Sequence, residues 1–419
     1  MNFSRRMILI LLAICLLAGA ATGGTLYYQL AYLWIFLYVS SWILSKYSLR
    51  GLSLVRSSRT QRAQVGQIFE ERYDLFNHGK FLRLWIEVRD ESELPGSEGS
   101  RILTLINGKQ GRSYLARTRL QRRGVYELGP TVLASSDIFG LFPTKKIEGF
   151  RSSLMVYPLM FEIENFPFPP GLLSGGESLR RRTHQVTPNA AGVREFVHGD
   201  SLNRIHWLSS ARRDQLMVKE FELDPLADMW IFLDAYIYAQ QALPVVETSS
   251  TLVDIFHSEA KIELPPTTEE YGISAAASIA RLSLRRGRAV GLVAAGHQLT
   301  LLPPDRGGRQ LGKILESLAL LKAEGKIPLR TLIETQVKHI MRGSTVVLVS
   351  PLMNRDNEVL VDFLMQRGLR PIYIYIDPAT FGGPHSDTSA IAFRYKMMGI
   401  PYRRIVYGTD LGVSLSVDS

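Results

Sequence analysis

Residues 229–234, MWIFLD, form an uninterrupted apolar run that ends in an acidic side chain, Asp234. Similar apolar runs follow at 289–295, 345–350 and 371–376. Between them lie amphipathic patterns with helical spacing, at 270–286, 308–324 and 355–367. Buried strands that alternate with amphipathic helices are typical of a parallel sheet with helices on both faces. The sequence therefore predicts a doubly wound α/β domain over residues 229–419, completed by a helix at 389–398 and a short strand at 404–407.

The segment before this domain has the alternating pattern of half-buried strands. Leu82, Leu84, Ile86 and Val88 lie two residues apart and share one side of an extended chain. Similar short runs, separated by turn residues, lie at 67–76, 101–106, 112–120, 124–134 and 150–157. Six or seven short strands at this spacing predict an antiparallel β-sandwich of immunoglobulin-like size over residues 51–157. Residues 158–228, which begin with a proline-rich stretch, form the link to the α/β domain.

The N-terminal segment is apolar. Residues 7–45 contain no charged side chain, and a bilayer crossing needs about 20 apolar residues, so the run is long enough for nearly two crossings. Thr22-Gly23-Gly24-Thr25 predicts a tight turn between a span near 5–22 and a second span near 26–45. We therefore expect a transmembrane helical hairpin over residues 1–50. A cleaved signal peptide that ends near Ala18-Gly19-Ala20 is the alternative for the first span.

The net charge of +10 is concentrated beside this apolar run. Seven of the 49 Lys and Arg residues lie within residues 1–62, where no acidic residue occurs, and the rest of the chain has 42 basic and 39 acidic residues. Basic residues flank both spans while the turn has none, so the positive-inside rule places both ends in the cytoplasm. The near balance elsewhere argues against a nucleic-acid-binding surface. The single cysteine, Cys15, excludes a disulfide framework and a multi-cysteine metal site.

The densest polar stretch is residues 192–222, GVREFVHGDSLNRIHWLSSARRDQLMVKEFE. Its mixture of charged and apolar residues predicts a network of ion pairs and hydrogen bonds, in which a carboxylate can accept two bonds from one arginine and Trp207 can cover the ion pair. The candidate residues are Arg194, Asp200, Arg204, Trp207, Arg212 and Lys219. We expect a structural connector between the two domains, or a partner-binding surface. Catalysis is disfavoured because the stretch has no nucleophile–base pair and no carboxylate dyad.

This stretch resembles the signature of the bacterial DUF58 family. The matching residues are Gly192, Arg194, Phe196, Gly199, Asp200, Arg204, Ile205, Trp207, Ala211 and Arg212. Upstream, residues 122–130 (RRGVYELGP) and 137–142 (DIFGLF) resemble two further elements of the family. The resemblance covers nearly the whole chain. It implies membrane-anchored proteins with a β-sandwich and a domain similar to von Willebrand factor A, commonly encoded beside MoxR-type AAA+ ATPases, and it implies no enzymatic activity.

The resemblance leads us to expect a non-enzymatic scaffold or assembly factor at the bacterial inner membrane, with its folded domains in the cytoplasm. Its expected partners are the lipid bilayer, a MoxR-type AAA+ ATPase and membrane-protein clients. An envelope-associated hydrolase or nucleotide-dependent enzyme is the alternative.

Domains similar to von Willebrand factor A often hold Mg²⁺ through a D-x-S-x-S element after the first strand. Here Asp234 has the first position, but Tyr236 and Tyr238 replace both serines. Thr267 or Thr268 is the candidate for a further hydroxyl ligand, and Asp356 follows the strand at 345–350 only after several residues. We therefore expect no metal ion at this position and no other cofactor.

Two further patterns are weak. Residues 307–313 spell GxxxxGK, but Ile314 stands where a phosphate-binding loop needs Ser or Thr, and residues 303–305 are expected to be loop rather than strand. His198 and His206 are eight residues apart and lack the spacing of a zinc site. We expect His206 to be a packed, hydrogen-bonded residue.

Overall fold

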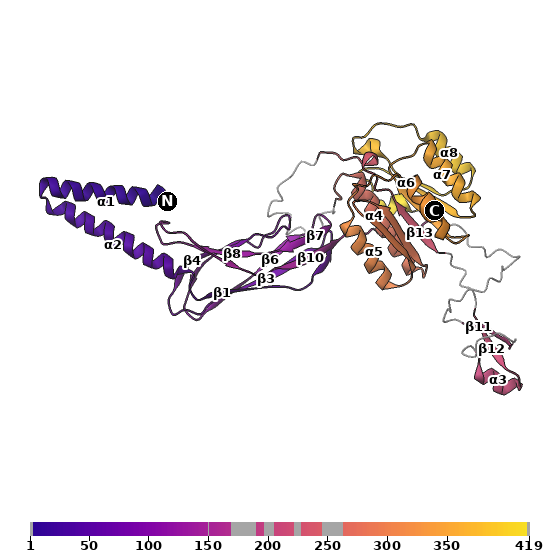
Figure 1. Ribbon diagram of the computed structural model, residues 1–419, viewed down its shortest axis with the longest axis horizontal. Coiled ribbons are helices and arrows are strands. Elements are labelled where there is room, and N and C mark those ends of the chain that lie inside the picture. The colour runs from indigo at the N-terminus through magenta and orange to yellow at the C-terminus, as the bar shows by residue number, and fades with distance from the viewer. Residues whose placement is uncertain are drawn as a thin grey trace. The chain divides into compact units, whose positions relative to one another are not determined.

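The computed structural model describes residues 3–149, 151–168, 190–196, 205–221, 228–244 and 263–416 (Figure 1). The chain forms two compact units. The N-terminal unit is built mainly from residues up to Leu159, and the C-terminal unit mainly from Met160 onward. The fold is mixed α/β with several separate sheets.

Two helices open the N-terminal unit, α1 (Phe3–Thr22) and α2 (Thr25–Ser48). They meet at Gly23, whose φ of 68° lies in the left-handed region that favours glycine. Among the described residues, one helical segment, Arg5–Thr22, is long and apolar enough to cross a membrane by length and composition. An N-terminal signal sequence has the same length and apolar composition, so the transmembrane hairpin stays a prediction.

Both helices contact the loop at residues 137–142 of the β-structure. The Asp137 carboxylate accepts the backbone N–H groups of Phe139 at 3.1 Å and Phe142 at 2.7 Å, which closes the loop. Leu141 and Phe142 are thereby buried in one cluster with Ile8 of α1. The Ser45 hydroxyl of α2 donates to the Phe142 carbonyl oxygen. One of the sequence elements that carries the family resemblance therefore packs on the N-terminal helices.

In the described residues of the N-terminal unit, ten strands form three sheets. The first sheet has the order β1 (Leu52–Ser58), β3 (Ile68–Asn77), β6 (Gly111–Arg119). The second has the order β2 (Arg62–Gln64), β10 (Ser152–Tyr157), β7 (Gly124–Leu128). The third has the order β5 (Arg101–Ile106), β4 (Arg83–Asp90), β8 (Thr131–Ser135), β9 (Thr144–Glu148).

This arrangement differs from the predicted sandwich of six or seven antiparallel strands. The predicted run at 124–134 is two strands, β7 and β8, which belong to different sheets. They separate at Gly129-Pro130, where Gly129 has a φ of 89° and Pro130 has no N–H to donate to a ladder. In addition, β2 pairs with β10 in parallel. Tyr73, Leu75, Ile86 and Leu133 form the core between the first and third sheets.

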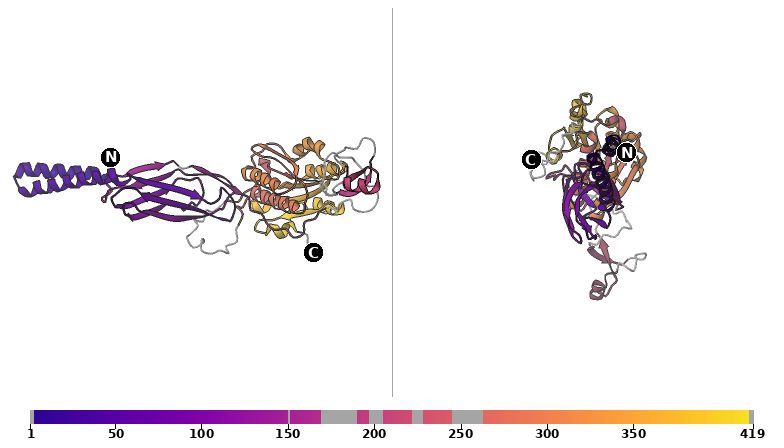
Figure 2. Two further views of the ribbon diagram at one scale, coloured as in Figure 1. Left: turned by 90° about the horizontal axis from the view of Figure 1, so that it is seen from below. Right: turned by 90° about the vertical axis from the view of Figure 1, so that its left-hand side faces the viewer.

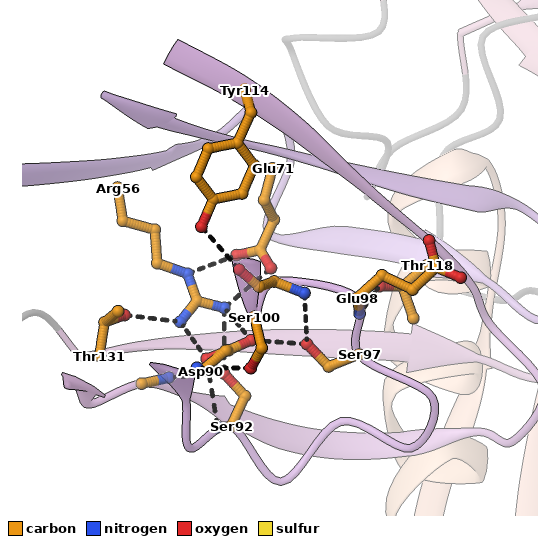
Figure 3. A network of polar contacts seen from close by, with 12 residues as sticks. Arg56, Glu71, Asp90, Ser92, Ser97, Glu98, Ser100, Tyr114, Thr118 and Thr131 are labelled. Carbon is orange, nitrogen blue, oxygen red and sulfur yellow. Dashed lines mark hydrogen bonds and ion pairs between the residues drawn. The ribbon is translucent and has the colours of Figure 1, made fainter. Parts of the chain in front are cut away.

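A buried ion cluster connects these two sheets (Figure 3). The guanidinium of Arg56, on β1, donates to both carboxylate oxygens of Glu71 on β3 at 2.8 Å, and to Asp90 Oδ1 on β4 at 2.8 Å. All three side chains are almost fully buried. Burial raises the pKa of Glu71. Burial acts in the same sense on Asp90, but hydrogen bonds from Ser92 and Ser97 lower its pKa. The Arg56 guanidinium thus binds one carboxylate with a raised pKa, Glu71, and one with a lowered pKa, Asp90.

The C-terminal unit contains a six-stranded sheet of order β15-β14-β13-β16-β17-β18. Its strands are β13 (Met229–Leu233), β14 (Val290–Ala295), β15 (Leu299–Asp305), β16 (Thr345–Ser350), β17 (Arg370–Ile376) and β18 (Tyr402–Ile405). Its helices are α4 (Thr268–Arg285), α5 (Gly308–Leu320), α6 (Leu329–Gln336), α7 (Arg355–Gln366), α8 (Ser389–Met397) and α9 (Leu411–Leu415). The four apolar runs of the sequence are β13, β14, β16 and β17, which are parallel to one another.

Helices cover both faces of this sheet (Figure 2). Side chains alternate between the faces of a strand. Phe232 of β13 packs in one cluster with Leu332 of α6 and Leu360 of α7. The neighbouring Leu233 lies under Gly272 of α4, where an added Cβ would be 3.3 Å from the leucine side chain.

One edge of the sheet is an antiparallel strand that the sequence pattern does not predict. Residues 303–305, expected to be loop, are the end of β15, which pairs antiparallel with β14. Pro303 and Pro304 are tolerated because an edge strand leaves one row of backbone positions without a ladder partner. The sheet is therefore mixed rather than wholly parallel.

Along the chain, a separate two-stranded sheet follows the proline-rich stretch and precedes the six-stranded sheet. Its strands, β11 (Ala190–Glu195) and β12 (Met217–Phe221), are antiparallel. The short helix α3 (Trp207–Arg213) precedes β12.

Candidate functional site at the carboxyl edge of the six-stranded sheet

Asp234 and Ser350 lie side by side where two parallel strands end. Leu233 of β13 pairs with Val349 of β16, so the residues that follow them meet at the carboxyl edge of the sheet. From β13 the chain continues to β14 on one side and later to β16 on the other. Ligands of open α/β sheets bind at such a reversal of strand order, outside the carboxyl ends of the strands. This edge is therefore the candidate functional site.

The Asp234 carboxylate is held by neutral donors from its surroundings. The Ser350 hydroxyl donates to Oδ2 at 2.6 Å, and the backbone N–H of Tyr236 donates to Oδ1 at 3.1 Å. Asp234 is 5% exposed. Burial raises the pKa of its carboxyl group, although the two hydrogen bonds act in the opposite direction. The site therefore favours the protonated acid more than an exposed aspartate does.

Ser350 also fixes the loop that follows its own strand. Its hydroxyl oxygen accepts the backbone N–H of Leu352 at 3.0 Å. The Leu352 carbonyl oxygen in turn accepts the Asn357 side-chain amide at 2.8 Å. The buried Tyr373 hydroxyl accepts from the same amide at 2.9 Å. These bonds tie the ends of β13 and β16 to the start of α7, so the edge is internally cross-linked.

The structure distinguishes the two candidate threonines. Thr267 is the N-cap of α4, and its hydroxyl oxygen accepts the Glu270 N–H at 3.1 Å. Thr268 donates its hydroxyl to Gln240 Oε1 at 2.8 Å, while the Gln240 amide donates to the Asp234 carbonyl oxygen at 3.0 Å. Thr268 and Asp234 line one small cavity of about 10 Å³, which is room for a single water molecule.

These residues do not fit a magnesium ion. Mg²⁺ requires near-octahedral oxygen ligands that include one or two carboxylates. Both Asp234 oxygens already accept protein donors, and Asp356 forms an exposed ion pair with Arg330 at 3.4 Å. Tyr238 is 77% exposed, and its ring contacts that of Tyr236. Within the described ranges, no group of three or more His, Cys, Asp or Glu side chains is arranged to hold a metal ion.

A second acid lies at the same edge. Asp377 directly follows β17, and its carboxylate forms an ion pair with Arg404 of β18 and accepts the Ala379 N–H at 3.1 Å. Neither Ser350 nor Asp377 is among the site residues predicted from the sequence. The signal that identified Asp234, a polar residue at the end of an apolar strand, would have identified both.

The signature residues of the 192–222 stretch are placed only in part. Arg194 on β11 pairs with Val218, and the neighbouring Val193 pairs with Lys219 on β12, so Arg194 and Lys219 occupy adjacent rungs. Asp200 and Arg204 lie outside the described residues. The network predicted around them therefore stays a prediction.

Helix α3 carries the other two signature residues. Trp207 is 68% exposed and Arg212 is also exposed. Leu208 beside it is 63% exposed. His206 caps the helix, because its Nδ1 accepts the Ser209 N–H at 3.2 Å. The helix therefore exposes an apolar pair, Trp207 and Leu208.

The GxxxxGK pattern follows a strand but does not form a phosphate-binding loop. Helix α5 begins at Gly308, so most of the pattern is already helical and does not wrap around a phosphate. Ile314, which stands at the position of the required hydroxyl, is fully buried.

Part of the chain matches a known protein family. Residues 192–242 and 245–370 match the family described as "Protein of unknown function DUF58". The "Uncharacterized protein YeaD" of Bacillus subtilis (strain 168) is 25% identical over 239 residues, which are 56% of this chain and 52% of that protein. The chain thus matches about half the length of this curated relative.

Likeness to solved structures is remote. The CARDB domain of a Pyrococcus furiosus protein, in complex with di-metal ions, is 13% identical with a TM-score of 0.20, over 25% of this chain and 91% of that domain. Proximal thread matrix protein 1 from the mussel byssus is 10% identical with a TM-score of 0.29, over 46% of each chain. Neither likeness bears on function.

Proposed function

The chain belongs to the DUF58 family, and from this premise we propose that it is a non-enzymatic, membrane-anchored scaffold or assembly factor that binds protein partners through its C-terminal unit. In this proposal the C-terminal unit is a domain similar to von Willebrand factor A. The partner is a MoxR-type AAA+ ATPase, and the clients are membrane proteins at the bacterial inner membrane.

The filled carboxyl edge of the six-stranded sheet is the observation that supports this proposal most. The position where open α/β sheets bind small ligands is here cross-linked by Asp234, Ser350 and Thr268. The remaining cavity of about 10 Å³ is far smaller than the roughly 300–1,000 Å³ of small-molecule sites. A domain without room for a small substrate at this edge is better suited to present its surface to another protein.

The membrane anchor is supported by the two N-terminal helices and their charges. α1 is long and apolar enough to cross a membrane, and α2 is 24 residues long. Arg5 and Arg6 lie at the start of α1, Lys46 and Arg50 lie at the end of α2, and the turn between the helices has no basic residue. This distribution supports an anchor with both ends in the cytoplasm.

The apolar pair Trp207 and Leu208 is the proposed contact for the ATPase. Both residues fall within the region matched by the family and are more than half exposed. Tryptophan is one of the side chains enriched among the few residues that supply most of the binding free energy of an interface. Removal of this pair is therefore expected to weaken partner binding without unfolding the protein.

Affinity purification of the full chain from membranes tests the proposal. We expect a MoxR-type ATPase to co-purify with the unmodified chain and to be depleted by Trp207→Ala with Leu208→Ser. Phe393→Ala on α8 is the matched control, because Phe393 is 66% exposed and lies outside the matched region. A monodisperse monomer without an ATPase would contradict the scaffold. Turnover of a substrate that is lost in Asp234→Asn would instead support an enzyme.

A further inference from the structure

The inward face of β4 continues beyond the core of the N-terminal unit. Side chains two apart share one face of a strand, and Ile86 and Val88 are fully buried on that face. Leu84 is 43% exposed on the same face, and Leu82 just before the strand is 45% exposed. The sequence thus keeps an apolar face where the protein supplies no covering layer.

A groove lies over this uncovered face. Its volume is about 560 Å³, within the roughly 300–1,000 Å³ of small-molecule sites. The last part of α2 also lines the groove, with Ile43, Leu44 and Tyr47, and the loop after β8 adds Ile138. These side chains are all more than 40% exposed. The groove is therefore apolar and open to an occupant.

One cation lines this apolar groove. Arg83 is 8% exposed, its Nη2 donates to the Arg50 carbonyl oxygen at 2.7 Å, and its Nε has no hydrogen-bond partner. Among the described residues, no carboxylate forms an ion pair with it. Asp137 also lines the groove, but its oxygens accept the N–H groups of Phe139 and Phe142. The Nε–H is therefore a buried donor of a charged group without an acceptor, which is costly, and an anionic oxygen that reached this guanidinium would offset the cost.

We propose that this groove binds a membrane phospholipid, with an acyl chain along Leu84 and Ile43 and a phosphate oxygen at Arg83. The inference rests on the proposed membrane anchor. Residues 43–47 are both a wall of the groove and the end of the second proposed span, so the groove opens where α2 would leave the bilayer. Lys46 lies on the last turn of α2 and Arg50 follows the helix, and both attract the phosphate layer. A phospholipid supplies the apolar chain and the anionic oxygen together at that place.

The test combines photocrosslinking with native mass spectrometry of the full chain. The chain is reconstituted in nanodiscs with phosphatidylglycerol that carries a diazirine in one acyl chain, and adducts are mapped by peptide. We expect adducts on residues 81–85 and 135–138, which are not part of either proposed span. Adducts confined to α1 and α2 would overturn the groove.

Four variants separate the apolar wall from the cation. Leu84→Trp fills the groove and abolishes adducts at 135–138, whereas Ile102→Trp, at an exposed position of β5, leaves them unchanged. Arg83→Gln weakens retention of phosphatidylglycerol in detergent about tenfold, the loss expected for one charge-assisted hydrogen bond, whereas Arg117→Gln does not. Because Arg83 is buried, circular dichroism checks the fold of its variant. If Arg83→Gln unfolds, Leu84→Trp alone decides.

Two other ligands test the assignment of the head group. Diacylglycerol lacks the phosphate, so we expect it to bind about tenfold more weakly than phosphatidylglycerol and to be insensitive to Arg83→Gln. Equal binding of both would overturn the role of Arg83. Palmitate that binds as tightly as phosphatidylglycerol would assign the groove to a fatty acid and overturn the phospholipid. A chain that stays in the membrane fraction with its ATPase but gives no adduct refutes the groove and leaves the scaffold intact.

Discussion

Replacement of Arg56 by methionine tests whether the buried ion cluster holds two sheets of the N-terminal unit together. The guanidinium bonds Glu71 on one sheet and Asp90 on the other, and it also donates to Thr131 on the strand beside β4, at 3.5 Å. Methionine preserves an unbranched apolar stem but leaves two carboxylates buried without a cation. Loss of one partner of a buried ion pair costs about 3–5 kcal/mol. We expect a loss of this size, concentrated where the two sheets meet.

Hydrogen exchange measured by mass spectrometry on the full chain reads this loss locally. The chain has two units, so a single global unfolding transition would not isolate the N-terminal one. About 3–5 kcal/mol corresponds to roughly 100- to 4,000-fold faster exchange of protected amides, because each 1.4 kcal/mol is tenfold. Peptides from β3 and β4 should show this acceleration, and peptides from β13 and β16 should not.

Two variants separate burial from charge. Arg117→Met removes an exposed arginine that pairs with Glu70, and surface pairs contribute about 0–1 kcal/mol, so exchange should change less than about tenfold. Glu71→Gln added to Arg56→Met should recover part of the loss, since one buried charge disappears. If Arg56→Met is as mild as Arg117→Met, the reasoning about the cluster is refuted.

Three further changes have expected outcomes. Gly99→Ala should accelerate hydrogen exchange in peptides of β3 and β4, because its Cβ would overlap the Tyr73 hydroxyl and lie 2.6 Å from Asp90 Oδ2; unchanged exchange there would contradict this. Burial raises the folded-state pKa of Asp234, so the stability that its carboxyl group contributes is present at low pH and is lost as the pH rises through that pKa. Urea denaturation at several pH values, followed in peptides of β13, should show this loss of stability. The Asp234→Asn variant should not show it. Gln310→Ala should accelerate exchange in β15 by the equivalent of about 1–3 kcal/mol, since the buried amide donates to carbonyl oxygens at both strands of that edge; protection that persists would show that the edge strand does not depend on it.

The sequence predicts the central strands of the C-terminal unit because they are buried on both faces. A strand such as β13 or β16 then appears as a continuous apolar run that needs no further information. The edge strand β15 lacks this signal, since its residues alternate between exposed and half-buried and include two prolines. The short polar strand β9, TKKIE, is missed for the same reason.

Long-range pairings limit what the sequence can predict about sites. Asp234 is found because it directly follows a strand, but its partner Ser350 is 116 residues away and is identified by the register of β13 with β16. The Arg56 cluster depends in the same way on three strands from two sheets. The exposure of Trp207 depends on how α3 packs, and no periodicity in seven residues specifies it.

The docking of the 137–142 loop on α1 and α2 limits where the chain can be shortened. Removal of residues 1–50, the usual step for obtaining a soluble fragment of an anchored protein, takes away Ile8, Trp34 and Tyr38, which surround Phe142. It also takes away the Ser45 hydroxyl that donates to the Phe142 carbonyl oxygen. The freed loop would add Leu141 and Phe142 to a surface that already exposes Phe139. Such a fragment should self-associate unless these side chains are made polar.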